Sequence, residues 1–255
     1  MSTKTPWVSN YLHPSKWEQT FPPLSVHDMF FGSAERQGKA PIADFMGRKF
    51  SYAEMAQMVR RFARGLQLQG VGKGDHVGLF LPNVPHYIAA YYGALAAGAT
   101  VVNFSPLYTV DELSHQVADS GTSILVTVSA AALLPTAIKV LNQSSLKQLI
   151  VGNVAEALPR LKGLAYRLLK RAETTEVPSD DRITRFARFM SNDGAFEPVA
   201  CEPETDIAQL QYTGGTTGTP KGAMLTHQNI SANARQINLL DPHSRVNNPQ
   251  ENATD

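Results

Sequence analysis

The feature of this 255-residue sequence that most constrains its fold is an alternation of capped helical patterns with short apolar runs. Ser51 and Glu54 form a capping box, and apolar residues then recur at helical spacing over 55–66. Thr109 and Glu112 repeat the capping signature ahead of another helix. Because buried strands and helices that alternate along a chain usually build a parallel sheet, this pattern predicts helices on both faces of such a sheet.

The expected strands are compact apolar runs at 76–81, 99–104, 122–128 and 148–151. We expect a helix capped by Asn83 after the first run, and another helix over 131–142 despite Pro135. The sequence therefore predicts an α/β fold with parallel sheets flanked by helices, in one large domain or two small ones.

Composition excludes several classes of protein. A net charge of +1 gives no reason to expect nucleic acid as a partner. Cys201 is the only cysteine, so we expect no intramolecular disulfide and interpret this thiol as inert in a reducing compartment. The N-terminus lacks the apolar segment of a secretory signal. The run 87–102 falls short of a bilayer span and is rich in alanine, which favours a buried helix that runs into a strand. We therefore expect a soluble, cytoplasmic chain.

Residues 158–172 have the pattern of a basic amphipathic helix. One face would carry Leu161, Leu164, Ala165, Leu168 and Leu169. The remainder would carry Arg160, Lys162, Arg167, Lys170 and Arg171, with no acidic residue. Two interpretations stay open. The helix could pack its apolar face on the domain, or it could make peripheral contact with an anionic membrane on its inner, cytoplasmic face.

The stretch YTGGTTGTPKG at 212–222 lies between two strand-like segments, 206–212 and 222–226, and a helical pattern follows over 230–240. Glycine lets backbone N–H groups approach an anion, threonine adds hydroxyl donors, and Lys221 adds a positive charge. These features predict a phosphate-binding loop beyond the carboxyl ends of the strands, rather than a flexible turn.

The loop is not a Walker A motif, because Pro220 precedes the lysine and Gly222 follows it, so a classical P-loop NTPase is excluded. Instead, YTGGTTGTPKG with AMLTHQN behind it closely resembles the phosphate-binding motif of the AMP-forming adenylating enzymes. That superfamily includes acyl-CoA synthetases, firefly luciferase and the adenylation domains of peptide synthetases. FSYAEM at 50–55 and ALAAGATVVNFSPLYTVDEL at 94–113 are similar to two further segments of the family.

The resemblance covers about residues 25–240, and the Thr-Gly-Gly-Thr-Thr-Gly loop with LTHQNISAN behind it looks most like bacterial long-chain fatty acid–CoA ligases. Residues 1–27 are rich in proline, tryptophan and serine without periodicity, and we expect them to form an extended leader. The resemblance implies an AMP-dependent synthetase/ligase domain over 28–240. This domain would be an incomplete form of the family's large N-terminal domain.

The chemistry that the resemblance implies begins with attack of a fatty-acid carboxylate on the α-phosphorus of ATP, which releases pyrophosphate and forms an acyl-adenylate. Coenzyme A then displaces AMP. Contacts to the phosphates would come from Thr213, Gly214, Gly215, Thr216, Thr217, Gly218 and Lys221. Thr213 is the first candidate to approach Mg²⁺ and Thr217 the second. Tyr212, His86 and His227 are interpreted as structural.

Other parts of the family pattern have no counterpart in this sequence: the later Tyr-Gly-x-Thr-Glu segment, the acidic residue that holds the ribose, and the catalytic lysine. We therefore expect no catalytic residue here. We expect 241–255 to be a disordered or frame-shifted tail and the chain to be a truncated, inactive form. A non-catalytic nucleotide- or acyl-binding remnant stays open, as does a ligase for an aryl or amino acid.

Overall fold

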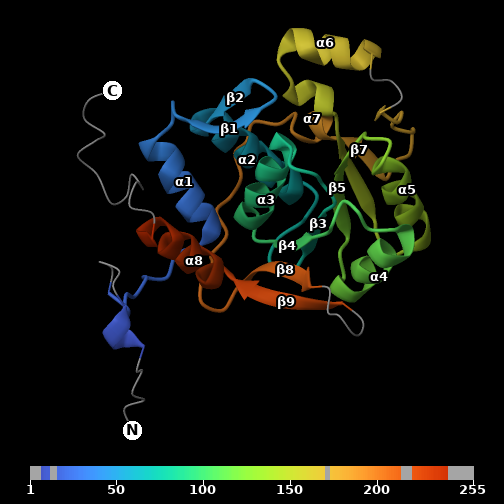
Figure 1. The fold of residues 1–255 in the computed structure, drawn as a ribbon. Coiled ribbons are helices and arrows are strands. Elements are labelled where there is room, and N and C mark those ends of the chain that lie inside the picture. Colours follow the sequence, from blue (N-terminus) through green and yellow to red (C-terminus); the bar gives the residue numbers. More distant parts are fainter. Residues whose placement is uncertain (1–6, 12–15, 170–172, 214–219, 241–255) are drawn as a thin grey trace.

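The computed structural model describes residues 7–11, 16–169, 173–213 and 220–240. At its centre lies a seven-stranded sheet of order β7-β6-β5-β3-β4-β8-β9 (Figure 1). These strands are β3 (His76–Leu79), β4 (Thr100–Asn103), β5 (Ile124–Val128), β6 (Gln148–Gly152), β7 (Ile183–Arg185), β8 (Ile207–Thr213) and β9 (Lys221–Thr226). All neighbouring strands run parallel except β9, which pairs antiparallel with β8. The predicted α/β class is confirmed.

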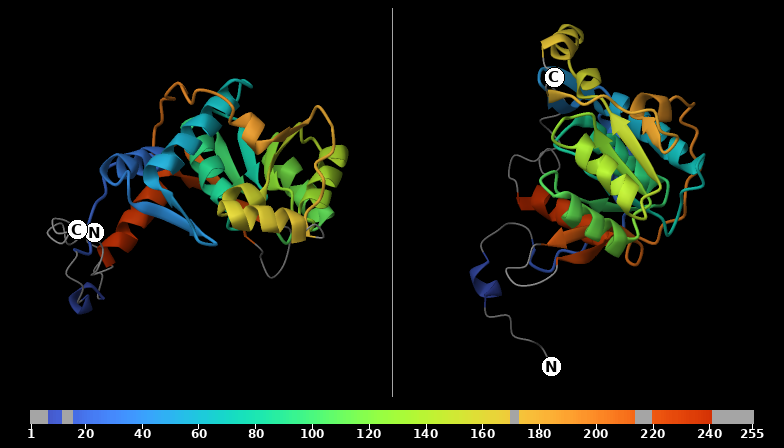
Figure 2. Two further views of the ribbon diagram at one scale, coloured as in Figure 1. Left: turned by 90° about the horizontal axis from the view of Figure 1, so that it is seen from above. Right: turned by 90° about the vertical axis from the view of Figure 1, so that its right-hand side faces the viewer.

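Helices cover both faces of this sheet (Figure 2). They are α1 (Val26–Arg36), α2 (Tyr52–Gln67), α3 (Pro85–Ala96), α4 (Val110–Ser120), α5 (Leu134–Gln143), α6 (Arg160–Leu169), α7 (Phe186–Phe189) and α8 (His227–Leu240). Two short 3-10 helices, η1 (Val8–Asn10) and η2 (Val154–Ala157), and a separate antiparallel hairpin of β1 (Pro41–Phe45) and β2 (Arg48–Ser51) complete the described fold. Helices α1, α2 and α3 pack together, and α4 packs on α5.

Both predicted capping boxes are present. Ser51 Oγ accepts from the Glu54 backbone N–H, and the Glu54 carboxylate accepts from the Ser51 N–H in return. Thr109 and Glu112 make the same reciprocal pair at the start of α4. The run 87–102 forms most of α3 and the buried start of β4, as expected. Among the described helices none has both the length and the apolar character to cross a bilayer.

The structure corrects two predicted helix starts. The N-cap of α3 is Val84, not Asn83, and no side chain caps this helix. Pro85 takes the first helical position, where its fixed φ suits the helix and its missing N–H costs no hydrogen bond. For the same reason Pro135 is tolerated in α5, because it lies in the first turn and the helix begins only at Leu134.

Of the segment predicted as an extended leader, residues 1–27, the structure describes 7–11 and 16–27, and these parts include the helix η1 and the start of α1. Ser25 caps α1 by accepting from the Asp28 N–H, so this helix begins at Val26. Just before it, Gln228 on α8 donates to the Phe21 carbonyl and accepts from the Leu24 N–H. The start of the domain is therefore fastened to its last described helix.

Helix α6 contradicts the interpretation in which its apolar face packs on the domain. Leu161 is 84% exposed, Leu164 59% and Leu169 81%. The helix itself is present where the sequence predicts it, but these three leucines face solvent.

Candidate phosphate-binding site

The Gly/Thr loop joins β8 to β9, as the sequence predicts, and α8 follows directly. Strand β8 runs parallel to β4, with Asn103 opposite Gln211, so the loop leaves the sheet at the carboxyl end of β8. Thr213 ends β8 and Lys221 begins β9. The remaining predicted phosphate contacts lie outside the described residues; they are Gly214, Gly215, Thr216, Thr217 and Gly218.

Thr213 and Lys221 are directly opposite each other in the hairpin register. Directly opposite residues of an antiparallel pair point to the same face, with Cβ atoms about 5 Å apart. Both residues are exposed. The hairpin therefore presents a hydroxyl and an ammonium group together at the base of the loop, and these are donors that suit the oxygens of a polyphosphate.

Tyr212 points to the other face and anchors the base of the loop. Its hydroxyl donates to Asp119 Oδ2 on α4 at 2.5 Å, and its side chain is buried. Gly222 lies opposite Tyr212, where an added Cβ would come within 3.3 Å of the tyrosine ring. Burial, reinforced by Asp119, raises the pKa of the phenol well above its usual range, so it stays a neutral donor. The structural role predicted for Tyr212 is confirmed.

A ladder of polar side chains that the sequence analysis missed lies beside the hairpin. Tyr91 on α3 donates to Gln209 at 2.9 Å, and Gln209 donates to Gln211 at 2.8 Å. The Gln211 oxygen also accepts from Asn103 at 3.4 Å, and Tyr87 donates to Asn103 at 2.9 Å. Since strand residues alternate, Gln209 and Gln211 share the face of Thr213. The alternating glutamines in DIAQLQY were the available signal.

The described residues fit phosphate better than they fit Mg²⁺. No cluster of three or more histidine, cysteine or acidic residues that could hold a metal occurs in the described ranges. Thr213 offers one hydroxyl, and the Asp119 carboxylate already accepts from Tyr212. Mg²⁺ usually keeps several waters and binds through one or two carboxylates plus substrate phosphates. The part of this site that the structure describes would therefore contact Mg²⁺ through Thr213 alone.

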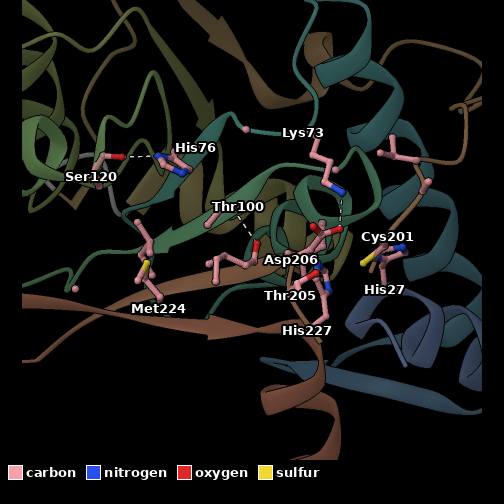
Figure 3. Close-up of a pocket in the computed structure, with 18 of the residues that line it drawn as sticks. His27, Lys73, His76, Thr100, Ser120, Cys201, Thr205, Asp206, Met224 and His227 are labelled. Carbon is pink, nitrogen blue, oxygen red and sulfur yellow. Dashed lines mark hydrogen bonds and ion pairs between the residues drawn. The ribbon is translucent and has the colours of Figure 1, made fainter. Parts of the chain in front are cut away.

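A cavity of about 530 Å³ lies under the opposite face of the hairpin, where Tyr212 and Met224 line it (Figure 3). At its other end Lys73 pairs with Asp206 at 2.7 Å, near Cys201. Burial raises the pKa of the Cys201 thiol to about 11, so the thiol stays protonated, in keeping with the inert role predicted for it. Because Thr213 and Lys221 point to the other face, this cavity is distinct from the candidate phosphate-binding site.

The two histidines interpreted as structural are buried. His227 packs edge to face on His27 at 5.4 Å between ring centroids, and its Nδ1 accepts from the Val26 N–H at 3.2 Å. Burial lowers the pKa of His227 to about 4. His86 packs against the Phe186 ring and Gly152, and burial lowers its pKa to about 4 as well. Both are neutral at pH 7, and their burial agrees with structural roles.

Comparison with known proteins gives a consistent result. The family model described as AMP-binding enzyme matches residues 30–253. A long-chain-fatty-acid–CoA ligase of Bacillus subtilis is 36% identical over 236 residues, which cover 91% of this chain and 42% of that protein. The corresponding ligase of Escherichia coli is 37% identical over 249 residues, or 92% of this chain and 42% of its own length.

Among solved structures, a long-chain-fatty-acid-CoA ligase from Archaeoglobus fulgidus superimposes with a TM-score of 0.66 at 29% identity. The superposition covers 87% of this chain and 40% of that one. The chain thus spans 42% of the length of the two relatives that it matches in sequence. The family match reaches residue 253 and so includes most of the segment predicted as a tail, which lies outside the described residues.

Proposed function

This chain belongs to the AMP-binding enzyme family, and on that premise we propose that it carries the phosphate-binding part of an AMP-forming, long-chain fatty acid–CoA ligase. The observation that carries the proposal is the pairing of Thr213 with Lys221 at the base of a loop of glycine and threonine. The proposed substrates are a long-chain fatty acid, ATP and coenzyme A.

In the proposed first step, a carboxylate oxygen of the fatty acid bonds to the α-phosphorus of ATP. The bond to the bridging oxygen of the β-phosphate breaks, and pyrophosphate leaves with the bonding electrons. Charge grows on the leaving group, so the Thr213 hydroxyl and the Lys221 ammonium would stabilise it where it develops. Mg²⁺, bound with ATP, would neutralise part of the phosphate charge. In the second step the thiol of coenzyme A displaces AMP from the acyl carbon.

The roles of this chain's own residues divide between contact and support. Thr213 and Lys221 would touch the β- and γ-phosphates together with the residues from Gly214 to Gly218. Tyr212, which donates a hydrogen bond to Asp119, would fix the position of the loop relative to the sheet. No described residue is assigned to proton transfer, because the proposed chemistry needs none from the hairpin.

Binding of pyrophosphate and of ATP with Mg²⁺ to the chain, measured by titration calorimetry, tests the assignment. Since a hydrogen bond to a charged group contributes about 1.5–3 kcal/mol, Lys221→Gln and Thr213→Val should each weaken pyrophosphate binding by about tenfold or more. Lys139→Gln, at an exposed lysine on α5, is the matched control and should bind as the unaltered chain does. Equal affinity in all the variants would refute the site.

We further propose that residues 1–255, tested by themselves, form little or no acyl-adenylate, because no described residue of the hairpin supplies more than phosphate contacts. Each lost transition-state contact typically costs orders of magnitude in rate. The test is release of pyrophosphate from ATP with Mg²⁺, with palmitate, benzoate or an amino acid as the carboxylate. Release above background would overturn this proposal and would also identify the class of acid.

The remaining proposal concerns location. We propose that the chain works in the cytoplasm, with peripheral contact to the membrane through residues 158–172. The structure of α6 allows this contact to be defined more closely.

A further inference from the structure

Helix α6 is attached to the body of the molecule along the side that carries Gly163. This glycine is buried, and a Cβ added to it would lie 2.6 Å from the Ala155 carbonyl oxygen in η2. No larger residue could occupy this position without moving the helix away. The close contact fixes which face of α6 is turned inward.

The face turned outward is the apolar one. At about 100° per residue, Leu161 and Ala165 lie nearly opposite Gly163, with Leu164 and Leu169 on either side of them. Ala165 is exposed, and the three leucines are 59–84% exposed. A surface helix ordinarily turns its apolar stripe to the core. In α6 the orientation is reversed, so the stripe is available to a partner.

The apolar surface continues onto the turn between β1 and β2. Met46 in this turn is 58% exposed. Lys162 on α6 donates to the Met46 carbonyl at 2.8 Å, and Arg48 donates to the Glu156 carbonyl in η2 at 2.7 Å. These bonds hold the turn beside the helix. We call Met46, Leu161, Leu164 and Leu169 the α6 surface.

Charge distinguishes the kind of partner that suits this surface. Residues 158–172 contain five basic residues and no acidic one, a charge of +5, whereas the whole chain carries +1. The rest of the chain therefore has a net charge of −4 (1 − 5). The positive charge is concentrated in this segment, which lies between Glu156 and Glu173 in the sequence. Exposed leucines in a segment this rich in basic residues are complementary to a surface that is both apolar and anionic.

We propose that the α6 surface docks on a lipid bilayer that contains anionic phospholipid. The helix would lie in the plane of the interface, with its leucines and Met46 at the acyl boundary and its basic residues at the headgroups. Figures 1 and 2 place α6 on the opposite side of the molecule from the β8–β9 hairpin, so docking leaves the phosphate-binding site open to water. The inference does not depend on the chemistry proposed for that site.

Sedimentation of the whole chain with lipid vesicles tests the proposal. The chain should bind vesicles of phosphatidylcholine mixed with phosphatidylglycerol, and bind far less to phosphatidylcholine alone. Leu161→Gln combined with Leu164→Gln should lower the partition coefficient by about tenfold or more, since both apolar side chains would leave the bilayer. The control, Leu107→Gln, alters a side chain that is 89% exposed elsewhere and should change nothing.

The electrostatic contribution has its own test. Raising the salt concentration should reduce binding to the anionic vesicles severalfold, because salt screens the attraction between the basic segment 158–172 and the headgroups. Thermal unfolding of each variant should match that of the unaltered chain, because the leucines that are replaced are exposed.

Three outcomes would overturn the proposal. The first is failure of the unaltered chain to bind anionic vesicles. The second is binding that the double leucine variant leaves unchanged. The third is self-association, seen by sedimentation velocity, that the double leucine variant abolishes, because the α6 surface would then be an interface between protein chains. Pyrophosphate binding by the same variants should stay intact, which separates failure of docking from failure of the phosphate site.

Discussion

The central strands and the β8–β9 hairpin belong to one sheet but are held by different forces. Every residue of β5 is buried, and so are Val77, Gly78 and Leu79 on β3. In β9, by contrast, the first four residues are exposed, and the hairpin base depends on a few polar contacts such as that between Tyr212 and Asp119. Packing on both faces fixes the centre, whereas the edge that carries the loop is held by the backbone pairing of β9 with β8 and by a few side-chain hydrogen bonds.

This difference suits the two tasks. Parallel strands covered on both faces give a rigid frame whose stability comes from apolar burial. In the proposed function, polyphosphate binding would need donors at defined places, and these contribute little to the stability of the fold. Substitutions at the centre should therefore unfold the protein, while substitutions at the hairpin should alter binding more than stability.

The largest effect should come from the centre of the sheet. Leu125→Ala on β5 removes a fully buried side chain and leaves a cavity, so the free energy of unfolding should fall by about 2–5 kcal/mol. Met224→Ala on β9 is the matched change in the hairpin, and because Met224 is 70% exposed its cost should stay within about 0.5 kcal/mol. Urea unfolding followed by circular dichroism measures both. Similar costs for the two variants would remove the distinction between the regions.

The sequence predicts the centre well, because its signals are local. The capping boxes at Ser51 and Thr109 each depend on a residue three positions away, and both helices begin where they indicate. Asn83 was misleading because Pro85, two residues later, sets the start of its helix. The sequence also predicts the loop and its flanks, since a run of glycine and threonine ending in lysine needs no tertiary information.

What the sequence could not provide depends on contacts between distant residues. The orientation of α6 is set by the approach of Gly163 to the Ala155 carbonyl, which no periodicity reveals. The polar ladder joins Tyr91 to Gln209, 118 positions apart. Pairing of Thr213 with Lys221 depends on the hairpin register. For α6, the amphipathic pattern alone left two orientations of the helix open.

The next effect is a dependence of stability on pH that arises in the core. His86 has a folded-state pKa of about 4, against an ordinary value of 6.5 in the unfolded chain. Because the unfolded state takes up the proton first, stability should be complete above pH 6.5 and fall as the pH drops towards 4, by about 1.4 kcal/mol per unit. His86→Leu should flatten this part of the profile, and unfolding at pH 7 and pH 5 gives the measurement.

His227 should add to the same pH dependence in the same direction, since burial also lowers its pKa to about 4. Its position in α8 allows the two contributions to be separated. His227→Asn keeps an acceptor for the Val26 N–H but removes the titration. If the variant that combines His86→Leu with His227→Asn has a stability profile as steep as that of the unaltered chain, other groups cause the slope.

A smaller loss should follow at the hairpin base. Tyr212→Phe keeps the ring but removes the hydrogen bond to Asp119, so the free energy of unfolding should fall by about 1 kcal/mol. Pyrophosphate affinity should fall severalfold, because the loop loses the contact that sets its position. Asp119→Asn keeps an oxygen acceptor and should retain most of both quantities. The idea of a positioning anchor would be wrong if Tyr212→Phe lost stability but bound pyrophosphate unchanged.

The smallest effect on stability, and the sharpest test of the comparison, lies in the polar ladder. Gln211→Met replaces the shared acceptor of Gln209 and Asn103 with a side chain of similar length. Both donors are partly exposed and can bond to water instead, so the cost in unfolding free energy should be about 0.5 kcal/mol. Gln211 is two residues from Thr213 on the same face of β8, so the threonine hydroxyl should lose part of its positioning.

Pyrophosphate affinity of Gln211→Met should therefore fall by about threefold while the fold stays intact. The loss of affinity should thus exceed the loss of stability, which is the reverse of what we expect for Leu125→Ala. Gln209→Met, one alternation further from the loop, serves as the control and should change affinity less. Because Thr213 and Gln211 act on the same loop, their effects should be less than additive in the double variant with Thr213→Val. Full additivity would mean that the ladder supports the sheet alone, and that the hairpin is held like the central strands after all.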